Sequence, residues 1–214
     1  MWDSLSPPWQ ATMELVWEAY CDDCIPIAAV ITDVDGNILA RGRNRIRSKR
    51  ASPQGFRAGN ILAHAEVEAL NNLDYDSVDR HTCILYTSTE PCPMCLGAFY
   101  MSGLRTLHYA SRDPYAGSVN LLGTTPYLSV KAIRIIGPTS LELENIIMAL
   151  YVEKELCDLN GNAHGHVVLK AWRHVVPGGV ALGESLYQTG KLRRLKDAGI
   201  SVHEVIDALV HQVQ

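Results

Sequence analysis

The chain has 214 residues, of which 47% are hydrophobic and 20% are charged, and its formal net charge is −4. This balance is typical of a globular protein and excludes a disordered chain. The acidic charge also argues against a protein whose whole surface binds nucleic acid, because phosphate binding depends on Lys and Arg.

The patterns along the chain predict an alternation of helices and strands. Helical spacing of apolar residues follows the Ser6-Pro7-Pro8 start, and β-branched runs on both sides of an Asp-Gly-Asn turn predict a hairpin. The predicted elements are, in order, a helix from Pro7 to about Tyr20, strands Ile25–Thr32 and Ile38–Arg45, an exposed loop Arg47–Gly59, a helix from His64, strand Thr82–Ser88, helix Pro91–Ser102, strands Arg105–Ala110 and Lys131–Ile136, and an amphipathic helix from Leu141 to about Leu159.

This order implies an α/β fold in three layers, with a mixed sheet between helices on both faces. Asn160-Gly161-Asn162 marks a boundary, so we expect one domain over residues 1–159 and a helical C-terminal extension over 160–214. The sequence assigns no role to this extension. Within it, Pro177-Gly178-Gly179 should break the chain, and helices are expected over Lys191–Lys196 and His203–Val213.

No segment reaches the roughly 18 apolar residues of a membrane span, and Met1–Ser4 does not begin like a signal peptide. We therefore expect a cytoplasmic protein with no membrane partner. The six cysteines are too few for a disulfide framework. Cys21 and Cys24 have metal-site spacing but no histidine close by in sequence, so we expect reduced thiols there.

Two short motifs together predict a catalytic metal site. Cys92 and Cys95 are separated by two residues at the start of a predicted helix, where the helix dipole favours thiolates that can bind zinc. His64, at the start of another helix, would be the third ligand. Three protein ligands leave one tetrahedral position open for water, which is typical of catalytic zinc and acidifies that water.

Glu66 follows the histidine by two residues and is not needed as a ligand. A carboxylate at this place can take a proton from the water and deliver protons to the ring nitrogen and the leaving amine of an aminated heterocycle. The alternatives are a structural zinc or a chance pattern. However, His-x-Glu followed by Pro-Cys-x-x-Cys is the signature of zinc deaminases, so we expect a hydrolytic deaminase with one zinc ion per chain.

These motifs resemble those of the cytidine deaminase-like superfamily, and most closely its branch of tRNA adenosine deaminases and guanine deaminases. The resemblance covers about Trp9 to Leu159 and includes Gly42-Arg43-Asn44-Arg45 and Ala110-Ser111-Arg112-Asp113. It implies a five-stranded sheet, zinc on His64, Cys92 and Cys95, and proton transfer by Glu66. It further implies that Asn44 hydrogen-bonds the base and that the protein is a homodimer.

The substrate is open between two classes. One is a free base or nucleoside, for which we expect a purine-like ring, with a cytosine or cytidine substrate as a lesser alternative. The other is an adenosine in a tRNA loop. Arg41, Arg43, Arg45 and Arg47 alternate along a predicted strand and its exit, so they could bind phosphate or form a solvated face. The acidic net charge favours the free substrate, and the intact Glu66 argues against a protein that only binds ligand.

Overall fold

A computed structural model describes residues 1–49, 51, 59–162 and 166–212. Within these residues, one mixed sheet has the strand order β2-β1-β3-β4-β5. Strand β1 is antiparallel to β2 and β3, whereas β3, β4 and β5 are parallel to one another. The predicted mixed sheet of five strands is therefore confirmed: β1 (Ala28–Thr32), β2 (Ile38–Arg43), β3 (Ile84–Thr89), β4 (Thr106–Ser111) and β5 (Arg134–Ile136).

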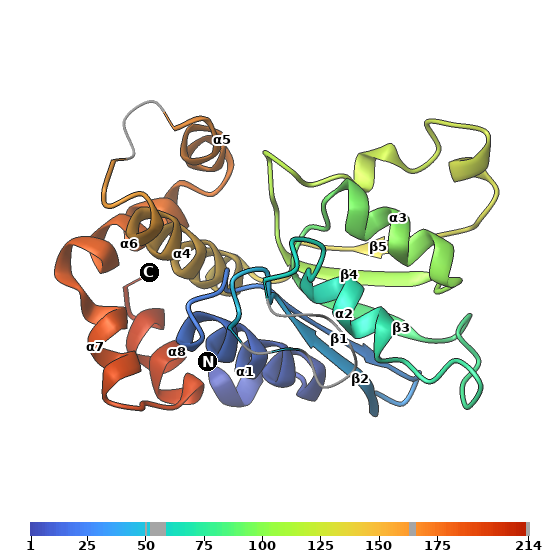
Figure 1. Cartoon of the computed structure of the whole chain (residues 1–214), viewed down its shortest axis with the longest axis horizontal. Helices are drawn as coiled ribbons and strands as arrows, with labels where there is room; N and C mark the ends of the chain where they lie inside the picture. Colours follow the sequence, from blue (N-terminus) through green and yellow to red (C-terminus); the bar gives the residue numbers. More distant parts are fainter. Residues whose placement is uncertain (50, 52–58, 163–165, 213–214) are drawn as a thin grey trace.

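Helices cover both faces of this sheet, which confirms the three layers (Figure 1). The alternation of side chains along β1 separates the two faces, since Ala29 and Ile31 pack with α2 and α3 while Ala28 packs with α1 and α4. The covering helices are α2 (Ala65–Asn71) and α3 (Pro93–Ser102) on one face, and α1 (Pro7–Cys21) and α4 (Leu141–Asp158) on the other.

Several element boundaries differ from the predicted ones. Strand β1 begins at Ala28 and not at Ile25, because Pro26 has no N–H to donate and Ile27 N donates instead to Ile25 O, 2.7 Å away. Strand β5 begins at Arg134 and not at Lys131. The loop predicted over Arg47–Gly59 contains no helix or strand where it is described, and its residues 50 and 52–58 lie outside the described part.

The C-terminal extension contains more helix than the sequence predicts. Among its described residues are the two expected helices, α7 and α8, and two further ones, α5 and α6. The expected break at Pro177 is wrong, because this proline is the first residue of α6, where its missing N–H is not needed. The four helices are α5 (Val167–Val175), α6 (Pro177–Thr189), α7 (Lys191–Asp197) and α8 (Val202–Val210).

Two glycines of α6 allow this helix to lie directly on α4 (Figure 1). A Cβ on Gly179 would lie 2.7 Å from Met148 Cβ, and one on Gly183 would lie 2.6 Å from Val152 Cβ. Helix α4 is therefore buried on two sides, and the predicted amphipathic character is wrong. The sheet side packs with α1, whereas the far side is covered by the extension.

The extension shares its core with the rest of the chain. Leu182, Leu186 and Leu209 belong to the same buried cluster as Trp9 and Leu143. The N-terminal amine lies 3.5 Å from Asp207 Oδ1 of α8, so the beginning of the chain contacts the extension. In the part of the chain that the structure describes, no helix is long and apolar enough to cross a membrane.

Candidate active site

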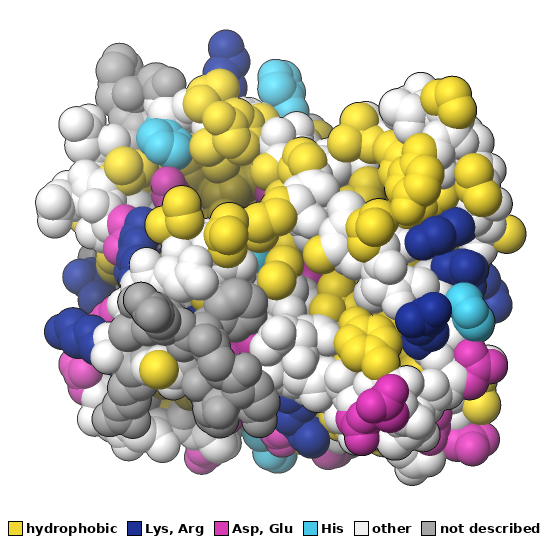
Figure 2. All heavy atoms as spheres, turned by 45° about the vertical axis from the view of Figure 1, so that its right-hand side comes forward, with side chains coloured by type: hydrophobic (Ala, Val, Ile, Leu, Met, Phe, Trp, Pro, Cys, Tyr) yellow, Lys and Arg dark blue, Asp and Glu magenta, His cyan; other side chains and the backbone are white. Residues whose placement is uncertain are grey.

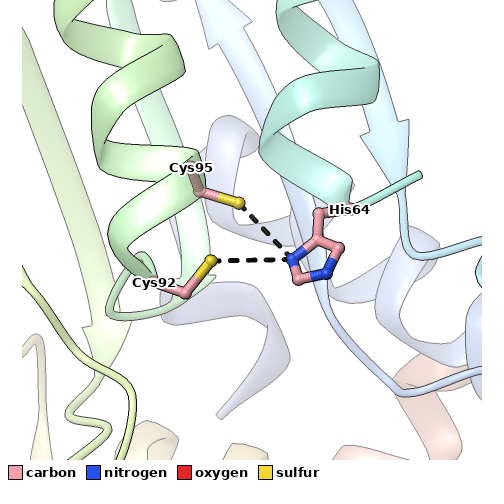
Figure 3. Close-up of side chains that lie close together, drawn as sticks. All are labelled: His64, Cys92 and Cys95. Atoms are coloured by element: carbon pink, nitrogen blue, oxygen red, sulfur yellow. Dashed lines mark hydrogen bonds between the residues drawn. The ribbon is translucent and has the colours of Figure 1, made fainter. Parts of the chain in front are cut away.

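The three predicted metal ligands converge beyond the carboxyl end of the central strand β3 (Figure 3). His64 is the N-cap of α2 and Cys92 is the N-cap of α3, which follows directly on strand β3. Helix α2 reaches this position because Gly42 of β2 lets it pack on the sheet. A Cβ on Gly42 would lie 2.2 Å from Ala65 O. The positions of the candidate ligands therefore depend on the N-termini of α2 and α3 and on the close packing of α2 against Gly42.

The donor atoms have the spacing that tetrahedral zinc requires. His64 Nδ1 lies 3.7 Å from Cys92 Sγ and 3.5 Å from Cys95 Sγ. Zinc–sulfur bonds of about 2.3 Å and zinc–nitrogen bonds of about 2.0–2.1 Å, at the tetrahedral angle, place nitrogen and sulfur about 3.6 Å apart. One imidazole and two thiols are also a typical donor set for zinc. Both nitrogen–sulfur distances therefore match zinc coordination.

The surroundings favour a thiolate on Cys92. A hydrogen bond from Cys95 and a second from His64 lower the pKa of Cys92 to about 4. The N-terminus of α3 acts in the same direction, because its free N–H groups carry partial positive charge. Pro93, the first residue of α3, needs no hydrogen-bond partner there.

Glu66 is buried beside these ligands and lines the same cavity. Thr87 Oγ1, on strand β3, donates a hydrogen bond of 3.1 Å to Glu66 Oε1. Burial raises the pKa of the Glu66 carboxyl, which suits a group that must both accept and release a proton.

Asn44 also lines the cavity, and its side chain is 2% exposed. Its Oδ1 accepts a hydrogen bond of 3.2 Å from Ile46 N, which holds the turn after β2. Because a backbone N–H requires an acceptor, this contact orients the amide and leaves the NH₂ group as the donor available to a ligand. Asn44 can therefore recognise an acceptor atom.

The cavity has a volume of about 90 Å³. The predicted residues His64, Glu66, Cys92, Cys95 and Asn44 all line it. Tyr115 is 54% exposed and does not line the cavity, although the neighbouring Ala116 does. The remaining lining residues were not singled out as site residues from the sequence: Ile27, Ala65, Thr89, Glu90, Asp113, Ala116 and Tyr151.

Three of the four arginines along β2 and its exit, Arg43, Arg45 and Arg47, pair with carboxylates, whereas Arg41 is exposed. Arg43 Nη2 lies 3.0 Å from Asp22 Oδ2, Arg45 Nε lies 2.5 Å from Glu68 Oε1, and Arg47 pairs with Asp158. Glu68 is buried and also accepts a hydrogen bond from Arg43 N. On the face in Figure 2, the described Lys and Arg side chains lie in separate groups and form no continuous band. These arginines therefore act mainly within the chain.

Comparison with known families agrees with this geometry. Residues 8–111 match the family model described as the cytidine and deoxycytidylate deaminase zinc-binding region. A probable cytosine deaminase from Schizosaccharomyces pombe is 30% identical over 131 residues, which cover 61% of this chain and 74% of the relative. The chain belongs to this zinc-dependent deaminase family. Its residues 112–214 lie outside the matched region.

Two solved structures of deaminases that act on different substrates share this fold. A guanine deaminase from Nitrosomonas europaea superposes with a TM-score of 0.52 at 26% identity, over 72% of this chain and 87% of the other. A structure from a study of A-to-I editing by tRNA:A34 deaminases superposes with a TM-score of 0.50 at 26% identity, over 60% and 95%. The relatives thus support a nucleobase or nucleoside deaminase but differ in what they deaminate.

Proposed function

We propose that this protein is a zinc-dependent hydrolytic deaminase of a free, purine-like aminated base or nucleoside. The observation that carries the proposal is the buried Glu66 carboxylate, which shares one small cavity with the ligand set and with the amide of Asn44. Zinc held by His64, Cys92 and Cys95 would supply a polarised water of lowered pKa.

The chain's own groups would then move the protons. Glu66 accepts a proton from the attacking water, whose oxygen adds to the carbon that bears the amino group. The carboxyl next protonates the neighbouring ring nitrogen. It then passes the proton of the newly added hydroxyl to the amine, which leaves as ammonia while the carbonyl forms. The donor on Asn44 would hold the ring through an acceptor atom. The products are ammonia and the corresponding oxo base.

The proposal is tested by an ammonia-release screen of the zinc-loaded protein. The panel contains guanine, adenine, cytosine, their nucleosides and a tRNA anticodon hairpin. Glu66→Gln should retain one zinc per chain and lose turnover, since glutamine preserves the shape but cannot transfer protons. Turnover by that variant at the wild-type rate would exclude this mechanism.

The free substrate is supported by the ion pairs of Arg43, Arg45 and Arg47, because these three described cations already neutralise carboxylates of the chain. The guanine deaminase structure also aligns over more of the chain than the tRNA deaminase structure does, 72% against 60%. The preference for a purine rests on this likeness to the guanine deaminase structure alone.

Adenosine in tRNA is the second candidate, because the tRNA:A34 deaminase structure is covered over 95% of its length. Salt distinguishes the two. Binding that neutralises several phosphates weakens steeply with salt, whereas a free base has no such contacts. We expect kcat/KM to stay within about twofold between 50 and 200 mM salt. A fall of a hundredfold or more would favour RNA.

We also propose a homodimer. Met101, Tyr127 and Val130 are exposed by 65%, 55% and 74%, and Tyr127 Oη donates to Met101 Sδ, so these apolar side chains form one surface patch. A second copy is the proposed occupant of this patch. Sedimentation equilibrium should give twice the chain mass, with Met101→Glu shifted towards the monomer. A monomeric wild-type protein would contradict the proposal.

A further inference from the structure

The first helix of the C-terminal extension reaches the wall of the substrate cavity. Trp172 of α5 is 1% exposed, and its Nε1 donates a hydrogen bond of 2.9 Å to Asp113 Oδ1. Asp113 lines the cavity that holds the ligand set. A side chain of the extension, which lies beyond the family match at residue 111, is thus one hydrogen bond away from the substrate space.

Asp113 organises one side of this cavity. The same Oδ1 accepts hydrogen bonds of 3.0 Å from Tyr115 N and 3.1 Å from Ala116 N, and Ala116 also lines the cavity. The Asp113 carboxylate therefore stabilises the turn that follows β4 by accepting hydrogen bonds from two of its backbone N–H groups. Trp172 in turn orients the carboxylate, because its indole N–H donates to Asp113 Oδ1. Hydrogen bonds to a carboxylate are stronger than those between neutral groups.

Trp172 supports a second lining residue. The ring of Tyr151, on α4, lies with its centroid 4.5 Å from that of Trp172 and is tilted by 50°. Tyr151 also lines the cavity, although it lies almost forty residues after the turn that follows β4. Aromatic pairs at this distance favour a defined mutual orientation. One buried indole thus contacts two separate parts of the cavity wall.

A second connection between α5 and the turn is weaker. Arg112 Nη2 donates to Val175 O over 3.4 Å, and its guanidinium pairs with Glu144 at 2.8 Å. The Arg112 side chain is 40% exposed, so solvent screens this pair. The buried contact of Trp172 is therefore the connection that should control the turn.

We infer that Trp172 is a positioning residue, through which the C-terminal extension sets the shape of the substrate cavity. Asp113 and Tyr151 are the residues it positions. This gives the extension a role in substrate selection. The inference rests on the proposed function in one respect, namely that this cavity binds the substrate.

The decisive variant is Trp172→Phe, which keeps an aromatic ring against Tyr151 but removes the N–H donor. We expect KM to rise by about tenfold and the order of preferred substrates to change, with kcat and zinc content close to wild type. Leu192→Val is the matched control, since Leu192 of α7 is also fully buried in the extension's core but does not line the cavity. It should lower the melting temperature without changing KM.

A readout that does not depend on turnover separates this inference from the proposed function. Hydrogen exchange of the amides of Tyr115 and Ala116 should accelerate by about tenfold in Trp172→Phe and stay unchanged in Leu192→Val. Absence of ammonia release by the wild-type protein would overturn the proposed function and not the exchange result. Unchanged exchange, or unchanged KM and substrate order in a folded Trp172→Phe variant, would overturn the positioning role.

Discussion

Thr87 and Glu66 are joined by a hydrogen bond of 3.1 Å between two side chains that are both buried. The threonine lies on a central strand and the glutamate in the first turn of α2, so the sheet itself orients the carboxylate. Four predictions concern this site.

Removing the hydroxyl in Thr87→Val should lower kcat by about tenfold or more, since a hydrogen bond to a charged group contributes roughly 1.5–3 kcal/mol. Zinc content should not change, because Thr87 is not a ligand. Steady-state kinetics with metal analysis measure both. Thr87→Ser keeps the hydroxyl and should retain most activity. Equal kcat in the valine variant and the wild type would mean that Glu66 is held by other contacts.

Asn44→Asp separates the two ends of the amide. Aspartate keeps the acceptor for Ile46 N but removes the NH₂ donor, so we expect kcat/KM to fall by at least tenfold. Asn44→Ala removes both and should lower the melting temperature as well. Kinetics and thermal unfolding of the pair test this. Wild-type kcat/KM in the aspartate variant would rule out a donor role.

Thr89→Val should stabilise the protein. Thr89 Oγ1 is buried at the cavity and has no hydrogen-bond partner among the described residues. An unsatisfied buried hydroxyl costs about 1–3 kcal/mol, so its removal should raise the melting temperature by roughly 2–4 °C or more in a chain of this size. Calorimetry on the metal-free and zinc-loaded protein measures the change. A lower melting temperature would show that the hydroxyl has a partner in solution.

The lowered pKa of Cys92 predicts its reactivity in the metal-free protein. A pKa of about 4 keeps Cys92 ionised as the pH falls from 8 to 6, so its alkylation rate by iodoacetamide should hardly change. Cys157 is an internal comparison, because burial and Glu153 raise its pKa to about 11. Its rate should fall about tenfold per pH unit.

Peptide mass analysis after brief labelling follows both cysteines at once. Zinc should protect Cys92 from alkylation between pH 6 and 8, since the metal binds the thiolate. A Cys92 rate that falls in parallel with that of Cys157 would contradict the lowered pKa.

The sequence was sufficient to predict the sheet and to select three residues that the structure brings together as candidate ligands, because short motifs specify both. His64, Cys92 and Cys95 lie at helix starts whose signals are local, and Glu66 is fixed by its distance of two residues from His64. The mixed sheet follows from the alternation of helices and strands, and the pairing of its first two strands follows from the hairpin turn.

The rest of the cavity depends on contacts that no local pattern shows. Tyr151 lies on a helix whose apolar spacing does not distinguish core from cavity, and Trp172 reaches Asp113 across 59 residues of chain. Helix α6 was missed because Gly178 and Gly179 read as a break. Its helical form is stabilised by close packing on α4, which outweighs the low helix propensity of glycine.

The glycine contact between α6 and α4 has a consequence for homologous sequences. Met148 and Val152 are apolar on the side of α4 that faces away from the sheet, and they need a cover that only small residues at 179 and 183 permit. A deaminase of this family without such an extension should carry polar residues at those two positions of its last helix. A homologue with apolar residues at positions 148 and 152 should also have a covering helix later in its sequence. That helix should carry two small residues four positions apart, like Gly179 and Gly183 here.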